Sequence, residues 1–129
     1  MAGNSVALDT NIVVAHFRNP GRHDSRLAAN ELFLPVTVLA ELFAGAEKSA
    51  QPTKNRKVVE AFRSICNVLN CDESTASRYG EIWSSLAEAG QMIPTNDIWI
   101  AALAMQHGLP LVTEDGHFSR ISGLSLESW

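Results

Sequence analysis

The chain has 129 residues, of which 46% are hydrophobic and 19% are charged, a balance typical of one globular domain and not of a disordered segment. No apolar run approaches the roughly 20 residues of a membrane span, and the start, MAGNSVALD, lacks the basic region and long apolar core of a signal peptide. We therefore expect one compact domain, residues 1–129, located in the cytoplasm.

The charge is unevenly distributed along the chain. Ten Lys and Arg residues against fourteen Asp and Glu residues give a net charge of −4, which by itself argues against a nucleic-acid partner. Residues 1–71, however, carry a net +2, whereas residues 72–129 carry −6. The acidic half can form a metal site, and the basic half can hold phosphate.

The hydrophobic pattern predicts strands that alternate with helices. In chain order we expect a strand at 6–8, helices at 12–17 and 25–30, a strand at 32–34, helices at 36–47 and 53–65, a strand at 68–69, helices at 74–89 and 98–107, and strands at 111–113 and 124–126. Asp72 or Ser74 is expected to cap the long helix, which Gly90 closes. Such alternation implies an α/β fold with a central parallel sheet of about four to five strands and helices on both faces.

The two cysteines are not expected to pair. Cys66 and Cys71 are five residues apart, and an odd offset along a strand points side chains to opposite faces. We interpret both as free buried thiols. A zinc site is not indicated, because there is no C-x-x-C pair and the four histidines are scattered.

Acidic residues follow two of the expected strands, where open α/β sheets bind their ligands. Asp9 ends the first strand, and a carboxylate buried there is costly without a partner. Asp115 follows the fourth strand, and Asp97 begins the helix after Pro94. The joint placement suggests a cluster at one rim of the sheet.

Taken singly, three acids have simpler interpretations. Asp97 can be a helix cap, together with Thr95 or Asn96, and Asp115 can be a turn residue beside Gly116. Glu41 projects about 140° from the apolar stripe of its helix, which favours a solvated position.

A cluster of carboxylates favours a divalent cation, because like charges otherwise raise one another's pKa. Mg²⁺ accepts oxygen ligands and keeps several waters, and Mn²⁺ fits the same ligands. Such an ion lowers the pKa of water and neutralises charge on a phosphodiester, so phosphodiester hydrolysis is the predicted chemistry.

The chain resembles PIN-domain ribonucleases, specifically the VapC-type toxins of prokaryotic toxin–antitoxin pairs, over nearly its whole length. Each motif alone is weak, but their order and spacing are specific. The segments that carry the resemblance are VALDTN at 6–11, VLAEL at 38–42, IPTNDIWIAA at 93–102, LVTEDGHF at 111–118 and ISGL at 121–124, with Trp129 last.

The resemblance implies a metal-dependent endoribonuclease that cuts single-stranded or structured RNA with a metal-activated water. It implies a homodimer and a cognate antitoxin that blocks the acidic pocket, often with an arginine. For Glu41 it implies that the polar face of its helix lines the pocket. The implied metal-binding acids are Asp9, Glu41, Asp97 and Asp115, supported by Thr10, Asn11 and Thr113.

Other residues have two open interpretations. His117 can be a general base or a turn residue. The three tryptophans can stack on RNA bases or pack in the core or a dimer interface; they are Trp83, Trp99 and Trp129. Residues 21–24 are a candidate mobile loop beside the cleft. Eight basic residues can either contact RNA phosphates or form a solvated face. They are Arg18, Arg22, Arg26, Lys48, Lys54, Arg56, Lys57 and Arg63.

Two rival functions remain. Receiver domains and haloacid-dehalogenase-type phosphatases also place an aspartate after the first strand, but both need a later lysine, and this chain has none after Lys57. The position two residues beyond Asp9 is also Asn11 where those phosphatases have a second acid. The second rival is a catalytically inactive PIN-like module that binds RNA or protein.

Overall fold

The sheet of the computed structural model, which describes residues 3–129, is entirely parallel. Its five strands lie in the order β3-β2-β1-β4-β5. This confirms the predicted α/β fold and its sheet, although the last strand begins two residues later than expected. The strands are β1 (Ser5–Leu8), β2 (Glu31–Pro35), β3 (Asn67–Leu69), β4 (Leu111–Val112) and β5 (Leu126–Glu127).

The helices occupy the predicted segments with shifted ends. They are α1 (Thr10–Arg18), α2 (Asp24–Ala29), α3 (Val36–Lys48), α4 (Pro52–Ser64), α5 (Glu73–Ala89) and α6 (Thr95–Gln106). A short 3₁₀ helix, η1 (Gly116–Arg120), forms in addition where no helix was predicted. The largest difference is at α6, which begins at Thr95 and not at Ile98, because Pro94 takes the N-cap position and the helix starts directly after it. Asp97 therefore lies inside the first turn of α6.

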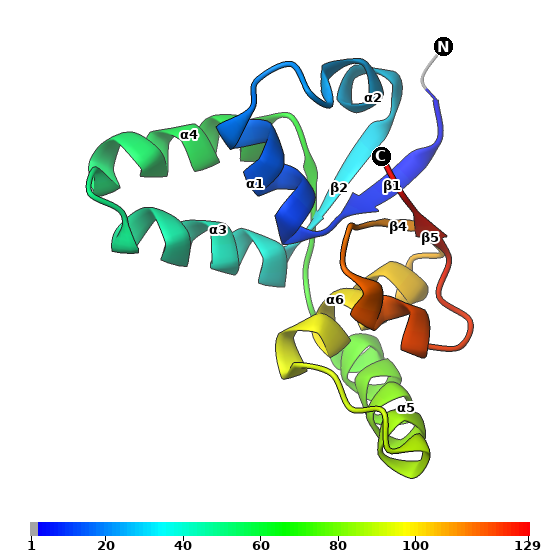
Figure 1. Cartoon of the computed structure of the whole chain (residues 1–129). Helices are drawn as coiled ribbons and strands as arrows, with labels where there is room; N and C mark the ends of the chain where they lie inside the picture. The colour runs from blue at the N-terminus through cyan, green and yellow to red at the C-terminus, as the bar shows by residue number, and fades with distance from the viewer. Residues whose placement is uncertain (1–2) are drawn as a thin grey trace.

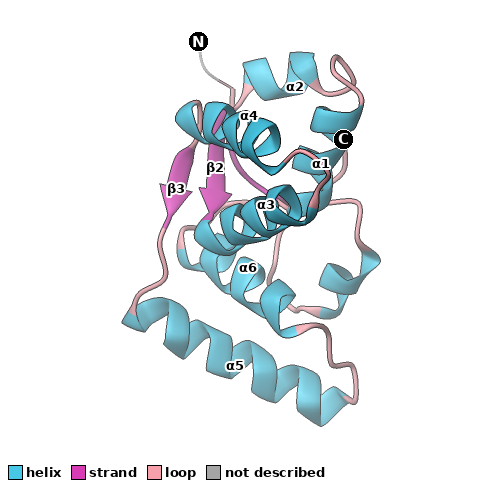
Figure 2. Ribbon diagram, turned by 90° about the vertical axis from the view of Figure 1, so that its left-hand side faces the viewer, coloured by secondary structure: helices cyan, strands magenta, loops and turns pink. Residues whose placement is uncertain are grey.

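Helices cover both faces of the sheet, as Figure 1 shows, with α1, α3 and α4 on one side and α5 and α6 on the other. The strand order explains this arrangement, because the chain moves outward from β1 to β3 and then crosses back to β4, and right-handed crossovers in opposite directions place their helices on opposite faces. In Figure 2, α6 lies between α5 and α3. No helix within residues 3–129 combines the length and apolar character needed to cross a bilayer.

Helix α6 is the centre of the core. Ile98, Ile100 and the run from Ala101 to Ala104 are all buried, so apolar residues occupy every side of the helix. A helix that is hydrophobic all round is packed on all sides. Its first turn, which carries Asp97, is thereby held rigidly against the end of the sheet.

The predicted ends of α5 are confirmed. The N-cap is Asp72, not Ser74: its side chain accepts a hydrogen bond from the Thr75 backbone N–H, and the Thr75 hydroxyl accepts one from the Asp72 backbone N–H. Gly90 ends the helix with φ 64°, a left-handed conformation that glycine adopts without steric cost.

The prediction for the cysteines is half right. Both are free, but only Cys66 is buried, and burial raises the pKa of its thiol to about 11. Cys71 is exposed, because it lies in the link between β3 and α5 and not in a packed strand. The odd spacing argument therefore does not apply to it.

The three tryptophans differ in their surroundings. Trp99 packs against Tyr79 with ring centroids 4.4 Å apart, and Trp129 packs against His23 with centroids 5.9 Å apart. Trp83 is 49% exposed on α5, so it does not belong to the core of this chain.

Candidate metal centre

The order of the strands reverses between β1 and β4, because the chain adds β2 and β3 on one side of β1 and β4 and β5 on the other. Such a switch point opens a crevice beyond the carboxyl ends of the two strands. Asp9 directly follows β1, and its backbone N–H donates to the Val112 carbonyl of β4 at 3.0 Å. Thr113 and Asp115 follow β4 at the same edge.

Asp9 is buried with both carboxylate oxygens hydrogen-bonded. The Thr113 hydroxyl donates to Oδ2 at 2.7 Å, and the Thr10 backbone N–H donates to Oδ1 at 2.8 Å. Burial raises the pKa of Asp9, and the charges of Glu41 and Asp115 raise it further, while the two hydrogen bonds oppose the shift. The carboxylate is oriented firmly in a site that disfavours its charge.

Thr113 links two of the acids. Its Oγ1, which donates to Asp9, accepts from the Asp115 backbone N–H at 2.9 Å and from Asn11 Nδ2 at 3.5 Å. Thr10 contributes its backbone N–H, while its hydroxyl is buried without a hydrogen-bond partner among residues 3–129. Thr10 and Thr113 therefore contact Asp9 directly, and Asn11 is connected to it through Thr113.

Asp97 reaches the same crevice from the first turn of α6. Its side chain makes no capping hydrogen bond in the part of the chain that is described, so the interpretation as a helix cap is wrong. Burial raises its pKa to about 6, with further increases from the charges of Asp9, Asp115 and Glu41 and a smaller opposing effect of His117. The negative charges of the neighbouring acids thus act on both Asp9 and Asp97.

Glu41 lies on α3 and is half-buried, so the solvated interpretation of its helical phase is wrong. Asn96 Nδ2 donates a hydrogen bond to Glu41 Oε1. Sequence reasoning considered Asn96 only as a cap. The available signal was its position beside Asp97, because two successive polar residues in the first turn of an apolar helix can face one crevice.

Asp115 serves as both a turn residue and a member of the cluster. Its Oδ1 accepts from the His117 backbone N–H at 2.9 Å and so caps η1. The His117 ring lies over the same acids, with Nδ1 3.2 Å from Asp115 Oδ1 and 3.8 Å from Asp97 Oδ2. One ligand atom from each of these three side chains falls within 4.8 Å of the others.

These donors fit a divalent cation. They offer carboxylate oxygens, which are common ligands of Mg²⁺ and Mn²⁺, and one imidazole nitrogen, which first-row transition ions also accept. Burial raises the pKa of Asp9 and of Asp97, and the neighbouring acids add to both shifts, so a cation would stabilise the ionised forms.

A groove of about 500 Å³ adjoins the cluster between α1, α3 and α4. Glu41 contributes to its lining, and Arg18 and Lys54 are the cations in it. The rest of its lining is mostly apolar and comprises Val14, Phe17, Leu42, Gly45, Ala46, Asn55, Val58 and Val59.

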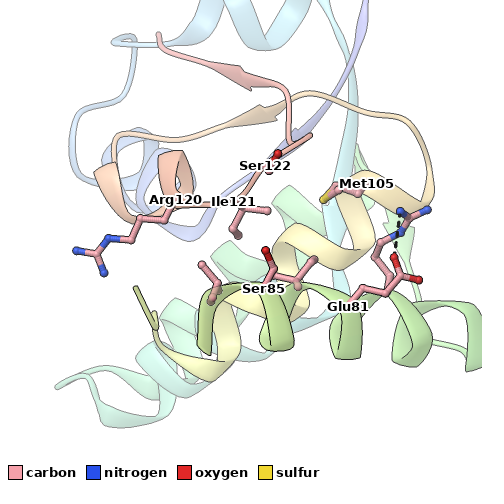
Figure 3. Close-up of a pocket in the computed structure, with 9 residues that line it drawn as sticks. Glu81, Ser85, Met105, Arg120, Ile121 and Ser122 are labelled. Carbon is pink, nitrogen blue, oxygen red and sulfur yellow. Dashed lines mark ion pairs between the residues drawn. The ribbon is translucent and has the colours of Figure 1, made fainter. Parts of the chain in front are cut away.

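A smaller pocket of about 180 Å³ lies against α5 and contains none of the four acids (Figure 3). Arg78 is 4.0 Å from Glu81, and Arg120 donates to the Met92 carbonyl at 3.1 Å. Figure 3 also shows the Arg120 side chain directed away from the pocket. Its cations are therefore engaged, and this pocket is not the candidate centre.

Carboxylates gathered at the switch point of a parallel sheet are the kind of site that metal-dependent nucleases use. The family model for the PIN domain matches residues 6–124. Ribonuclease VapC2 of Haemophilus influenzae is 38% identical, over 95% of this chain and 96% of that protein. The tRNA(fMet)-specific endonuclease VapC of Shigella flexneri is 36% identical over the same shares. The chain belongs to the PIN-domain family, among its VapC ribonucleases.

Solved structures agree with this assignment. The DNA-bound VapBC structure from Salmonella typhimurium matches with a TM-score of 0.92 and 35% identity, over 100% of this chain and 99% of that chain. The VapBC2 structure from Rickettsia felis, bound to a DNA fragment from its promoter, matches with a TM-score of 0.88 and 29% identity, over 97% and 98% of the two chains.

Proposed function

We propose that this chain is the endoribonuclease toxin of a toxin–antitoxin pair and that Asp9, Glu41, Asp97 and Asp115 hold its catalytic divalent cation. The observation that carries the proposal is the convergence of these carboxylates at the switch point, with the pKa of Asp97 raised to about 6. Mg²⁺ and Mn²⁺ are the candidate ions.

The surrounding residues orient the acids for hydrolysis. Thr113 and the Thr10 backbone N–H fix the Asp9 carboxylate, and Asn96 fixes Glu41. A bound ion supplies Lewis-acid activation of water and neutralises charge that develops on the phosphodiester. A preorganised set of acids needs little rearrangement during the reaction, which favours catalysis.

RNA is the proposed substrate. Because the Shigella relative is named for tRNA(fMet), transfer RNA is the first substrate to test. Arg18 and Lys54 in the groove beside Glu41 offer sequence-independent contacts to phosphates. Of the other basic residues, Arg22 is paired with Glu114 at 3.0 Å, and Arg56 with Glu60 at 3.2 Å.

The proposed protein partner is a cognate antitoxin, as in the VapBC structures to which the chain is similar. The groove between α1, α3 and α4 suits an apolar segment of such a partner, and the neighbouring carboxylates suit its basic side chain. We also expect a homodimer and a cytoplasmic location. The exposed Trp83 on α5 is a candidate for the dimer contact.

Cleavage of end-labelled tRNA tests the metal mechanism. Wild-type protein treated with EDTA should lose activity and regain it when Mg²⁺ or Mn²⁺ is restored. Asp9→Asn and Asp97→Asn should lower the rate by roughly a hundredfold or more, because even outer-shell changes at metal sites cost about 10–100-fold. Asp72→Asn, a change of the same kind at the cap of α5, should keep the wild-type rate.

Cleavage that is indifferent to EDTA would overturn the metal mechanism. RNA binding without cleavage in any metal would instead support the inactive binding module. The toxin role is tested separately, by growth arrest on expression and recovery on co-expression of a small partner encoded beside it. Normal growth at high expression would contradict that role.

A further inference from the structure

We propose that His117 supplies a nitrogen ligand, Nδ1, to the metal centre, and that the centre consequently prefers Mn²⁺ to Mg²⁺. The inference rests on the proposed metal centre and adds a ligand to it. It also replaces both earlier interpretations of His117, as a general base and as a simple turn residue.

The imidazole is placed to share an ion with two acids. Nδ1 lies 3.2 Å from Asp115 Oδ1 and 3.8 Å from Asp97 Oδ2. Two adjacent ligands of an octahedral ion with bonds of about 2.1 Å are about 3.0 Å apart, and opposite ligands are about 4.2 Å apart. Both separations lie between these values, and one ligand atom from each of the three side chains lies within 4.8 Å of the others, so modest side-chain shifts bring all three to one ion.

The surroundings of Nδ1 also favour a shared cation. The side chain of His117 is 44% exposed, but its Nδ1 atom is buried and makes no hydrogen bond among the described residues. Its ionic partners are Asp115 and Asp97, the two acids of the proposed centre. An ion between the imidazole and the two carboxylates would satisfy this nitrogen and neutralise the acids together.

The backbone of His117 is also held in place. The His117 backbone N–H donates to Asp115 Oδ1 at 2.9 Å, which ties the residue to its proposed co-ligand. The next residue, Phe118, is fully buried and anchors η1 to the core. A ligand held by packing and by a hydrogen bond loses little conformational freedom when it binds.

An imidazole changes the choice of metal. Mg²⁺ strongly favours oxygen ligands and retains its waters, whereas first-row transition ions accept nitrogen. The affinity for Mn²⁺ relative to Mg²⁺ is therefore higher in a centre with carboxylates and one imidazole than in a centre with carboxylates alone.

Pulsed electron paramagnetic resonance of the protein loaded with Mn²⁺ alone tests the ligand directly, because a coordinated imidazole modulates the signal through its nitrogen. Wild type should show this nitrogen modulation near pH 7.5. His117→Asn should lose it. The matched control is His107→Asn, which changes an exposed histidine at the opposite end of α6 from Asp97 and should behave as wild type.

Calorimetric titration with Mn²⁺ and Mg²⁺ gives a second readout. In His117→Asn the Kd for Mn²⁺ should rise about tenfold or more, and the Kd for Mg²⁺ by less than about threefold. His117→Asp supplies an oxygen in place of the nitrogen, so it should bind Mg²⁺ more tightly than His117→Asn and show no nitrogen modulation. Circular dichroism of each variant checks that the fold is intact.

The outcomes separate this inference from the proposed function. A wild-type Mn²⁺ complex without nitrogen modulation would overturn the His117 ligand and leave the carboxylate centre intact. Modulation that persists in His117→Asn would also overturn it. A wild type that binds neither ion would overturn both proposals.

Discussion

Asp97→Asn should stabilise the metal-free protein while it abolishes cleavage. In the folded chain, burial and the neighbouring acids raise the pKa of Asp97 from 3.8 to about 6. At 1.36 kcal/mol per pKa unit, this shift corresponds to roughly 3 kcal/mol of unfavourable free energy for the ionised form at neutral pH. Allowing for partial solvent screening, we expect the variant to gain about 2 kcal/mol.

The stability gained by the variant should depend on pH. Between pH 3.8 and about 6 the folded state binds the Asp97 proton more tightly than the unfolded state, so the stability of wild type falls as pH rises through this interval. Asparagine cannot ionise and escapes this loss. The advantage of the variant should therefore be full near pH 7.5 and shrink to about a third near pH 4.5.

Urea denaturation in EDTA measures this difference. A gain of about 2 kcal/mol should raise the midpoint of Asp97→Asn by roughly 1 M near pH 7.5. An equal or lower midpoint than wild type, or a difference that does not change with pH, would refute the reasoning that burial of the ionised Asp97 and repulsion from the neighbouring acids destabilise the metal-free fold.

Further predictions concern the cation and the residues around it. A cation at a hundredfold excess over its Kd should raise the free energy of unfolding of wild type by about 2.7 kcal/mol, whereas Asp97→Asn should show little stabilisation in the same thermal melts. Thr113→Val removes the hydroxyl that donates to Asp9 and should cost about 1–3 kcal/mol of stability and weaken cation binding about 10–100-fold, measured by urea denaturation and calorimetry; an unchanged Kd would contradict this role. Cation affinity should fall as pH drops through about 6, where protons compete for Asp97, and a Kd that is constant from about pH 5 to 8 would argue against Asp97 as a ligand. Asp72→Ala should cost about 1 kcal/mol by loss of the α5 cap, with no change in the cleavage rate.

Local sequence signals determined most of the secondary structure. The alternation of apolar strands and amphipathic helices, the cap at Asp72 and the stop at Gly90 depend on residues close in the chain, so they were readable without the fold. The errors fall where local signals are weak. Helix α6 begins directly after Pro94, three residues earlier than predicted. Cys71 is exposed because it lies in the link after β3, where the strand pattern does not apply.

The composition of the candidate centre was predicted by the motifs that resemble PIN-domain ribonucleases, and the role of its acids as ligands stays a prediction. Position alone supported only Asp9. Periodicity pointed Glu41 toward solvent, because it cannot distinguish water from a polar crevice. The Asn96 contact to Glu41 joins residues 55 positions apart, a separation that no local pattern reports.

The sequence by itself therefore determined the α/β class, the order of the elements and the acids at their ends, because these follow from short-range periodicity and capping. The tertiary structure alone decided that the strand order reverses between β1 and β4, which brings Asp9, Thr113 and Asp115 to one crevice. It also brought His117 against Asp97 and Asp115. These contacts depend on how the whole sheet and α6 pack, since burial and long-range pairing fix strand order and no residue spacing encodes it.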